Sequence, residues 1–174
     1  MIEETGTVQR AAAGDAAAFS ALVRQHQSAL RGFLRRLTRG DHSLADDLAQ
    51  DTFVEAHRKI TQFAGRGSFS GWLHAIAWSR FLMETRKRKL EPLDDDFADQ
   101  HSHAPEAATI SRLDLEAAFA TLRPAERAAL TLCFAVGMPH EEAAMTMNIP
   151  LGTLKSHVAR GREKLKNLLQ EPVP

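Results

Sequence analysis

The chain has 174 residues, of which 44% are hydrophobic and 25% are charged, and this length allows one medium domain or two small ones. No stretch approaches the ~20 apolar residues of a membrane span, and the acidic N-terminus does not resemble a signal peptide. The single cysteine, Cys133, excludes an intrachain disulfide and favours a reducing, cytoplasmic setting. The formal net charge of zero does not exclude nucleic-acid binding, because the basic and acidic residues are clustered in separate segments.

Two amphipathic helices are predicted in the first third of the chain. Apolar residues recur at three- and four-residue steps over residues 16–39, and Asp15 is suited to cap the start of that helix. Ser43 and Asp46 resemble a capping box, which predicts a second helix over about 43–62.

A third helix and then a break in the helical pattern follow. The segment 63–71 is rich in Gly and Ser and predicts a loop, after which a helix runs from about 70 to 89 and ends in a basic tail. Residues 90–108 are acidic and contain proline, so we interpret them as a linker.

A second helical group is predicted after this linker, over residues 110–122, 124–136, 139–147 and 151–169. The sequence therefore predicts an all-α fold with two small helical domains. These are residues 1–89 and 109–174, and the acidic linker 90–108 joins them.

A row of acidic side chains lies along the second predicted helix. Asp47, Asp51 and Glu55 follow one another at four-residue spacing, and Asp46 and Gln50 form a neighbouring row. Like charges at this spacing destabilise a helix by about 0.2–0.5 kcal/mol per pair. The row therefore favours a surface for a basic partner, with an ordinary solvated polar face as the alternative.

The third predicted helix combines aromatic and cationic residues, which suits single-stranded nucleic acid because aromatic faces stack on unpaired bases and cations follow the backbone. Taken alone, Trp72 also fits a place in the core. The four consecutive cations at 86–89 exceed what complementing a helix C-terminus requires. The candidate residues are Phe69, Trp72, Trp78, Arg80, Arg86, Lys87 and Arg88.

The last two predicted helices form a helix-turn-helix pattern, in which a short helix and a tight turn precede a longer basic helix. Leu154, Val158 and Leu165 fit its inward stripe. An ordinary amphipathic helix with a solvated basic face is the alternative. Groups that could bond phosphates or base edges are Thr153, Lys155, Ser156, His157 and Arg160.

Four segments, in this order, resemble the motifs of extracytoplasmic-function sigma factors of the sigma-70 family. They are Leu44–Ala56, Gly71–Ala77, Leu122–Leu132 and Ile149–Leu165. The resemblance runs from about residue 9 to residue 169. Four motifs in the family's order are far more specific than one helix-turn-helix.

The resemblance implies a transcription initiation factor that catalyses nothing, needs no cofactor or metal, and binds core RNA polymerase and promoter DNA. Asp46, Asp47, Gln50, Asp51 and Glu55 are then expected to face the coiled coil of the polymerase β′ subunit. Further expected partners are the polymerase β flap and an anti-sigma factor that covers both domains.

The resemblance also divides the DNA contacts between the two domains. The loop residues Phe63, Arg66, Ser68 and Phe69 are expected to hold a base flipped out of the non-template strand, and the helix 72–88 to read and help melt the −10 element. In the second domain, residues 151–162, including Arg162, are expected to enter the major groove of the −35 element.

The chain departs from the family pattern within the −10 helix. Trp78 and Ser79 stand where the family usually has Arg and Asn, and Met83 stands near where it has Asp. We therefore expect an unusual −10 preference, or an added stacking or anti-sigma surface at Trp78.

Three other functions are alternatives to that of a sigma factor: a decoy, a stand-alone regulator and an enzyme. A decoy that sequesters an anti-sigma factor fits the same departures, whereas a stand-alone helix-turn-helix regulator leaves the acidic row without a role. An enzyme is disfavoured, because His101 and His103 lie in the linker and the other histidines lack metal-ligand spacing.

Overall fold

The structure is a computed structural model that describes residues 2–65, 67–90 and 110–170. Arg66 and nearly all of the predicted linker lie outside these residues. The described residues form helices and no strand, which confirms the all-α prediction. In chain order the elements are α1 (Ile2–Ala12), α2 (Ala16–Leu37), α3 (His42–Lys59), the 3₁₀ turn η1 (Ile60–Gln62), α4 (Phe69–Leu90), α5 (Ile110–Thr121), α6 (Pro124–Leu130), the π-helical turn η2 (Thr131–Val136), α7 (His140–Met147) and α8 (Leu151–Gln170).

The first helix, α1, precedes every helix that the sequence analysis predicted. It packs along α2 and is held there by Glu4, whose Oε1 lies 2.7 Å from His26 Nε2 and 3.1 Å from Gln25 Nε2. Its buried residues include Val8 and Ala11, but Thr5, Gly6 and Thr7 in its middle are weak helix formers, so the local signal for this helix is weak.

The caps explain where α2 and α3 begin. Asp15 accepts hydrogen bonds from the amides of Ala17 and Ala18, which confirms its predicted role. The capping box predicted at Ser43 is wrong: Asp41 is the cap of α3, and its carboxylate accepts the amide of Leu44 at 2.9 Å. An aspartate two residues earlier satisfies the free amides of the first turn, so Ser43 lies inside the helix.

Helices α2, α3 and α4 pack on one another and enclose the first core. Leu30, Phe33 and Leu34 on α2 are completely buried, as is Leu73 on α4. Burial of these apolar side chains removes them from water and so stabilises the α1–α4 group.

The second group, α5–α8, is organised by two tight turns. Gly137 and Asn148 both adopt positive φ, at 82° and 53°, and they end η2 and α7 respectively. The turn at Asn148 sets α8 against α7 as a helix-turn-helix, and Leu154 and Val158 of α8 are buried as predicted.

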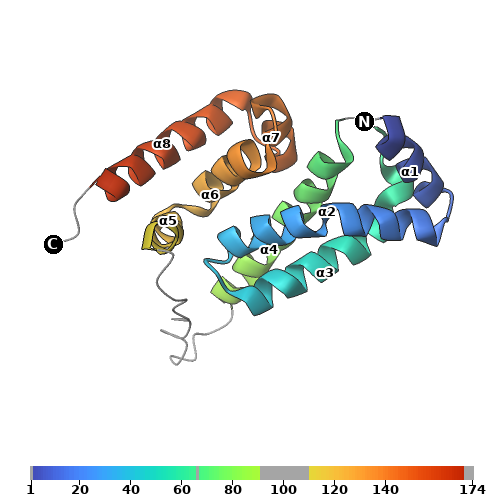
Figure 1. The fold of residues 1–174 in the computed structure, drawn as a ribbon, viewed down its shortest axis with the longest axis horizontal. Helices are drawn as coiled ribbons and strands as arrows, with labels where there is room; N and C mark the ends of the chain where they lie inside the picture. The colour runs from blue at the N-terminus through green and yellow to red at the C-terminus, as the bar shows by residue number, and fades with distance from the viewer. Residues whose placement is uncertain (1, 66, 91–109, 171–174) are drawn as a thin grey trace.

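The two groups touch each other directly. Helix α7 packs against α4, and α6 packs against α2 (Figure 1). None of the helices in the described part of the chain combines the length and the apolar character needed to cross a membrane.

Candidate partner and nucleic-acid interfaces

The acidic row predicted on α3 is on the surface, but its members differ in their partners. Asp47, Gln50 and Asp51 are exposed, and neither Asp47 nor Asp51 forms an ion pair with any described residue. Asp46 instead lies 3.4 Å from the guanidinium of Arg31 on α2. The unpaired carboxylates are therefore the part of the row that is available to a basic partner.

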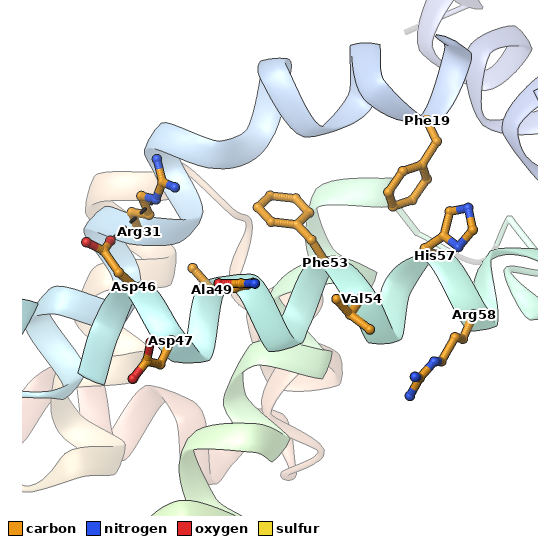
Figure 2. A pocket seen from close by; sticks show the side chains of 10 residues that line it. Phe19, Arg31, Asp46, Asp47, Ala49, Phe53, Val54, His57 and Arg58 are labelled. Carbon is orange, nitrogen blue, oxygen red and sulfur yellow. Dashed lines mark ion pairs between the residues drawn. The ribbon is translucent and has the colours of Figure 1, made fainter. Parts of the chain in front are cut away.

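A groove runs beside this row, between α2 and α3 (Figure 2). Phe19 and Phe53 line its floor, and Val54, 44% exposed, lies at its edge. Asp46 and Asp47 lie at one end of the groove together with Arg31, and His57 and Arg58 lie at the other, where the rings of His57 and Phe19 form a T-shaped pair. The groove thus combines an apolar centre with the carboxylate of Asp47, which forms no ion pair with a described residue, and this combination suits an amphipathic basic helix.

Glu55, the last member of the predicted row, is bound within the protein. Its carboxylate lies 2.6 Å from Lys59 Nζ and accepts a hydrogen bond from Arg80 Nη2 at 2.9 Å. The bond from Lys59, and then that from Arg80, hold the pKa of Glu55 below its usual value. Glu55 therefore joins α3 to α4 rather than standing free.

Three of the predicted aromatic residues meet at the start of α4. The ring centroids of Phe63, Phe69 and Trp72 are 5.4–5.9 Å apart, and the Phe69 ring also lies against His26. Phe69 is buried, whereas Phe63 and Trp72 are partly exposed. Of the three, only Phe63 and Trp72 offer ring surface to a base, while the buried Phe69 packs against both of them.

Trp78 is buried in the hydrophobic core. Only 8% of it is exposed, and its ring stacks on Phe81 with centroids 5.8 Å apart. The predicted base-stacking role of Trp78 stays a prediction, because the side chain is covered here.

The basic end of α4 is exposed. Arg86, Lys87 and Arg88 all face solvent, and Arg88 also bonds to Glu84 one turn earlier at 3.0 Å. Together these cations form a positive surface that suits a nucleic-acid backbone.

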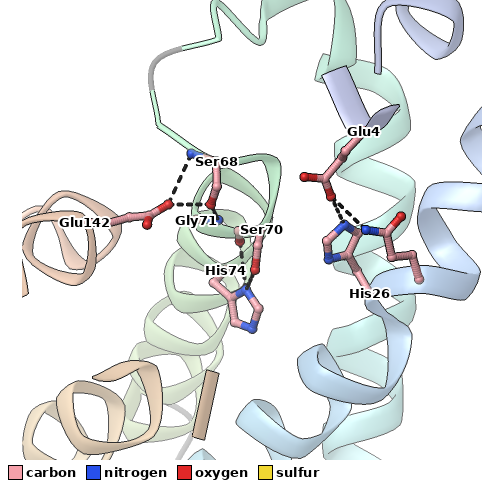
Figure 3. A network of polar contacts seen from close by, with 8 residues as sticks. Glu4, His26, Ser68, Ser70, Gly71, His74 and Glu142 are labelled. Carbon is pink, nitrogen blue, oxygen red and sulfur yellow. Dashed lines mark hydrogen bonds and ion pairs between the residues drawn. The ribbon is translucent and has the colours of Figure 1, made fainter. Parts of the chain in front are cut away.

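Ser68, another predicted loop residue, is bound to the second helical group (Figure 3). Its amide donates to Glu142 Oε1 on α7 at 3.1 Å, its hydroxyl donates to the same oxygen, and that hydroxyl also accepts the Gly71 amide. Sequence analysis missed Glu142, because a single acid on a short helix gives no local signal of a partner 74 residues away.

Helix α8 exposes most of the residues predicted to bind DNA. Thr153, Ser156 and Arg160 lie on one exposed face, and Lys155 is exposed beside them. His157, in contrast, is partly covered, and its Nδ1 has no hydrogen-bond partner. These hydroxyl and cationic groups can bond phosphates or base edges.

Arg162 lies further along α8 and has an aromatic partner. Its guanidinium carbon is 5.8 Å from the ring centroid of Phe134, which is 61% exposed. This contact fixes the cation at the flank of α8 while leaving much of the apolar ring uncovered.

Two charged residues of α6 are buried and were not predicted. Glu126 is 1% exposed and accepts hydrogen bonds from Lys164 Nζ at 2.7 Å and from the Arg123 amide at 3.1 Å. Burial raises the pKa of Glu126, but these two bonds outweigh it and the pKa lies below its usual value. The neighbouring Arg127 is 2% exposed, and burial followed by the charge of Arg39 lowers its pKa to about 10.

A metal centre has no support among the residues that the structure describes. No three His, Cys, Asp or Glu side chains lie close enough there to hold an ion. Cys133 is a free thiol whose pKa is raised by burial.

Comparisons with known proteins identify both helical groups. Residues 22–91 match the family model for Sigma-70 region 2, and residues 112–165 match that for Sigma-70 region 4. The chain is 38% identical to the ECF RNA polymerase sigma factor SigE of Mycolicibacterium smegmatis, over 96% of this chain and 68% of that protein. It is 32% identical to the RNA polymerase sigma-H factor of Pseudomonas aeruginosa, over 94% of this chain and 92% of the relative.

Solved structures also show similarity to sigma factors. The sigma factor RpoE of Bartonella quintana, in complex with the anti-sigma factor NepR, superposes with a TM-score of 0.77 at 32% identity. That match covers 89% of this chain and 98% of RpoE. CnrH, in complex with the cytosolic domain of CnrY, shares the fold with a TM-score of 0.70 at 24% identity, over 94% of each chain.

Proposed function

This chain belongs to the extracytoplasmic-function sigma factors of the sigma-70 family, and on that premise we propose which of its surfaces bind RNA polymerase and which bind promoter DNA. As an RNA polymerase sigma factor it is a transcription initiation factor and not an enzyme.

The polymerase surface is the exposed row of α3 together with the groove beside it. The observation that carries this proposal is that Asp47 and Asp51 are exposed and unpaired on α3, and that Asp47 lines the same groove as the apolar side chains of Phe53 and Val54. A basic coiled coil, such as that of the β′ subunit, would both pair the carboxylates and cover the apolar groove. Asp46, Gln50 and Glu55 lie around this centre.

The −10 surface is the loop before α4 and the exposed side of that helix. Phe63 and Trp72 supply the aromatic faces for an unpaired base, and Ser68 supplies an amide and a hydroxyl donor once Glu142, which accepts both here, is displaced. The cations at 86–88 would follow the strand backbone. The departures at Trp78, Ser79 and Met83 belong to this helix, so the −10 preference is proposed to be unusual.

The −35 surface is the exposed face of α8. Thr153, Lys155, Ser156 and Arg160 are available to phosphates and base edges, with His157 and Arg162 at the flanks. This placement of a recognition helix is typical of helix-turn-helix proteins.

The wider setting follows from the same family. We propose domain limits of 1–89 and 109–174, a cytoplasmic location, a contact with the β flap, and control by an anti-sigma factor. The similarity to RpoE, a sigma factor solved with its anti-sigma factor, supports the last of these.

Run-off transcription with purified core polymerase on genomic DNA tests the whole proposal. The chain is expected to initiate at a defined set of start sites that share −35 and −10 sequences. If the chain binds core polymerase but initiates nowhere, it is a decoy, and failure to bind core polymerase at all rejects the assigned surfaces.

A further inference from the structure

One side of α4 is accessible along most of the helix. Its residues follow one another at steps of four and three, which places them on one face, and we call this face the α4 stripe. The stripe consists of Trp72, Ile76, Ser79, Met83 and Arg86. The first two are partly exposed and the last three are exposed. The opposite side of α4, which includes Leu73, Ala77 and Phe81, is buried.

Met83 is a large apolar side chain in the exposed part of this stripe, with 58% of it exposed. Single exposed apolar side chains are common and by themselves need no partner. Met83 differs because the groups on either side of it suit nucleic acid. The hydroxyl of Ser79 lies one turn before it, and the guanidinium of Arg86 lies one turn after it.

The charge of the stripe favours DNA over a protein as its partner. Beyond Met83 the exposed side chains of α4 are the cations at 86–89. Glu84 is the only acidic residue in the sequence of α4, and its carboxylate accepts a hydrogen bond from Arg88 at 3.0 Å. The carboxylates proposed to bind polymerase lie on α3 instead. Met83 is therefore presented to a polyanion, with cations beside it.

The length of the stripe matches a short stretch of DNA strand. Trp72 and Met83 are separated by roughly 16 Å along the helix, at ~1.5 Å per residue. That length corresponds to about five bases at ~3.4 Å each. A strand with one base against Phe63 and Trp72 can therefore place another base of the same element against Met83.

The chemistry of the side chain decides what it can read on that base. A thioether has no hydrogen-bond donor and is only a weak acceptor, so it cannot distinguish bases by their polar edges. Thymine is the DNA base that carries a methyl group, at C5, and apolar side chains contact that group. An exposed methionine on a DNA-binding face is thus suited to thymine.

We infer that Met83 contacts the C5-methyl group of a thymine in the −10 element and is a specificity-determining residue that favours thymine at that position. This inference rests on the function proposed above, since it concerns the same −10 surface. Ser79 and Arg86 hold the strand on either side of the contact through its backbone.

The test uses two fluorescein-labelled, 12-nucleotide strands, oligothymidylate and oligodeoxyuridylate, which differ only in the C5-methyl groups. Anisotropy measures their affinity for the full chain bound to core polymerase, with core polymerase alone as the background. Covering one group of this size changes affinity about fourfold. Wild type is therefore expected to prefer thymidylate, and Met83→Gln to lose about fourfold of that preference.

Two further variants show that the effect belongs to the apolar surface of Met83. Met83→Leu keeps an apolar side chain and is expected to keep the preference. Met145→Gln is the matched control, because it makes the same exchange at a methionine that is 66% exposed on α7, outside the proposed DNA surfaces. It is expected to leave the preference at the wild-type value.

An equal preference for thymidylate in wild type and Met83→Gln overturns the inference. So does a loss of affinity for core polymerase in Met83→Gln, since Met83 would then belong to a protein interface. Binding of the wild-type chain to core polymerase is titrated in parallel. If that binding is absent, the proposed function fails and the inference fails with it, whereas normal binding with an unchanged preference rejects the role of Met83 alone.

Discussion

Arg80 on α4 and Glu55 on α3 are bound to each other, with Nη2 and Oε2 2.9 Å apart. The sequence placed Arg80 with the promoter strand and Glu55 with the polymerase. Their bond instead connects the helix proposed to hold polymerase to the helix proposed to read the −10 element. Each residue therefore has an internal partner that any external ligand must replace.

Substitution of Glu55 is expected to affect polymerase binding only weakly. Glu55→Gln releases Lys59 and Arg80 but leaves the unpaired carboxylates of α3 in place, so we expect a loss of affinity for core polymerase below about fivefold. Titration of labelled protein with core enzyme measures this. A loss as large as that from the exposed aspartates would mean that Glu55 contacts polymerase directly.

Charge reversal of the exposed aspartates is expected to abolish that binding. Asp47→Arg combined with Asp51→Arg places cations against a basic partner, and we expect affinity for core polymerase to fall at least about 100-fold. Because both side chains are unpaired in the free chain, circular dichroism and thermal unfolding should remain unchanged. Glu141→Arg on α7 is the control, and unchanged binding by the double variant would reject the assigned surface.

Truncation of the α8 cations is expected to weaken duplex binding through phosphate contacts. Lys155→Ala or Arg160→Ala should each reduce the slope of log affinity against log salt by about 1 on −35 duplex DNA. Lys166→Ala, on the exposed far part of the same helix, is the control. A slope that does not change would show that these side chains do not meet phosphates.

The pair between Lys164 and Glu126 is expected to contribute to stability in a pH-dependent way. The folded protein lowers the pKa of Glu126, so the stabilisation is present above the usual value of 4.5 and is lost as the pH falls through the folded value. Lys164→Met leaves a buried carboxylate with only the Arg123 amide, and we expect a loss of about 2–4 kcal/mol at pH 7.

Urea unfolding at several pH values checks this prediction, with Lys166→Met as the control. The carboxylate of Glu126 loses its ion-pair partner in the variant and would have a raised pKa. Its protonation should therefore reduce the difference in unfolding free energy between variant and wild type as the pH is lowered from about 7 to 5. If the difference in unfolding free energy stays constant with pH, Lys164 acts through packing and not through Glu126.

Trp78→Ala is expected to act mainly on stability. Its ring is buried against Phe81, and removing it should cost about 3–5 kcal/mol in unfolding free energy, whereas Trp78→Phe should cost much less. Chemical unfolding measures the loss. If Trp78→Phe is stable but forms open complexes poorly while binding −35 DNA normally, Trp78 has the base-stacking role that the sequence suggested.

Local sequence patterns were sufficient to predict most of the helices and to identify the family. The periodicity of α2 predicted its buried stripe, Asp15 predicted its start, and the spacing of α7, the turn and α8 predicted the helix-turn-helix. These features depend on residues within about one or two helical turns of each other, where sequence and conformation are directly coupled. The first helix was missed because Thr5, Gly6 and Thr7 are weak helix formers. The cap at Asp41 was missed because Ser43 with Asp46 offered a competing capping pattern two residues later.

The sequence alone thus determined an all-helical chain, its sigma-family motifs and the set of candidate residues. Only the tertiary structure decided how those candidates divide: Asp47 and Asp51 stay exposed, Trp78 is buried, Arg80 binds Glu55, and Ser68 binds Glu142. The physical reason is that burial and pairing are set by contacts between helices that lie far apart in the chain. No local periodicity records those contacts, because each helix pattern shows which side is apolar but not which partner covers it.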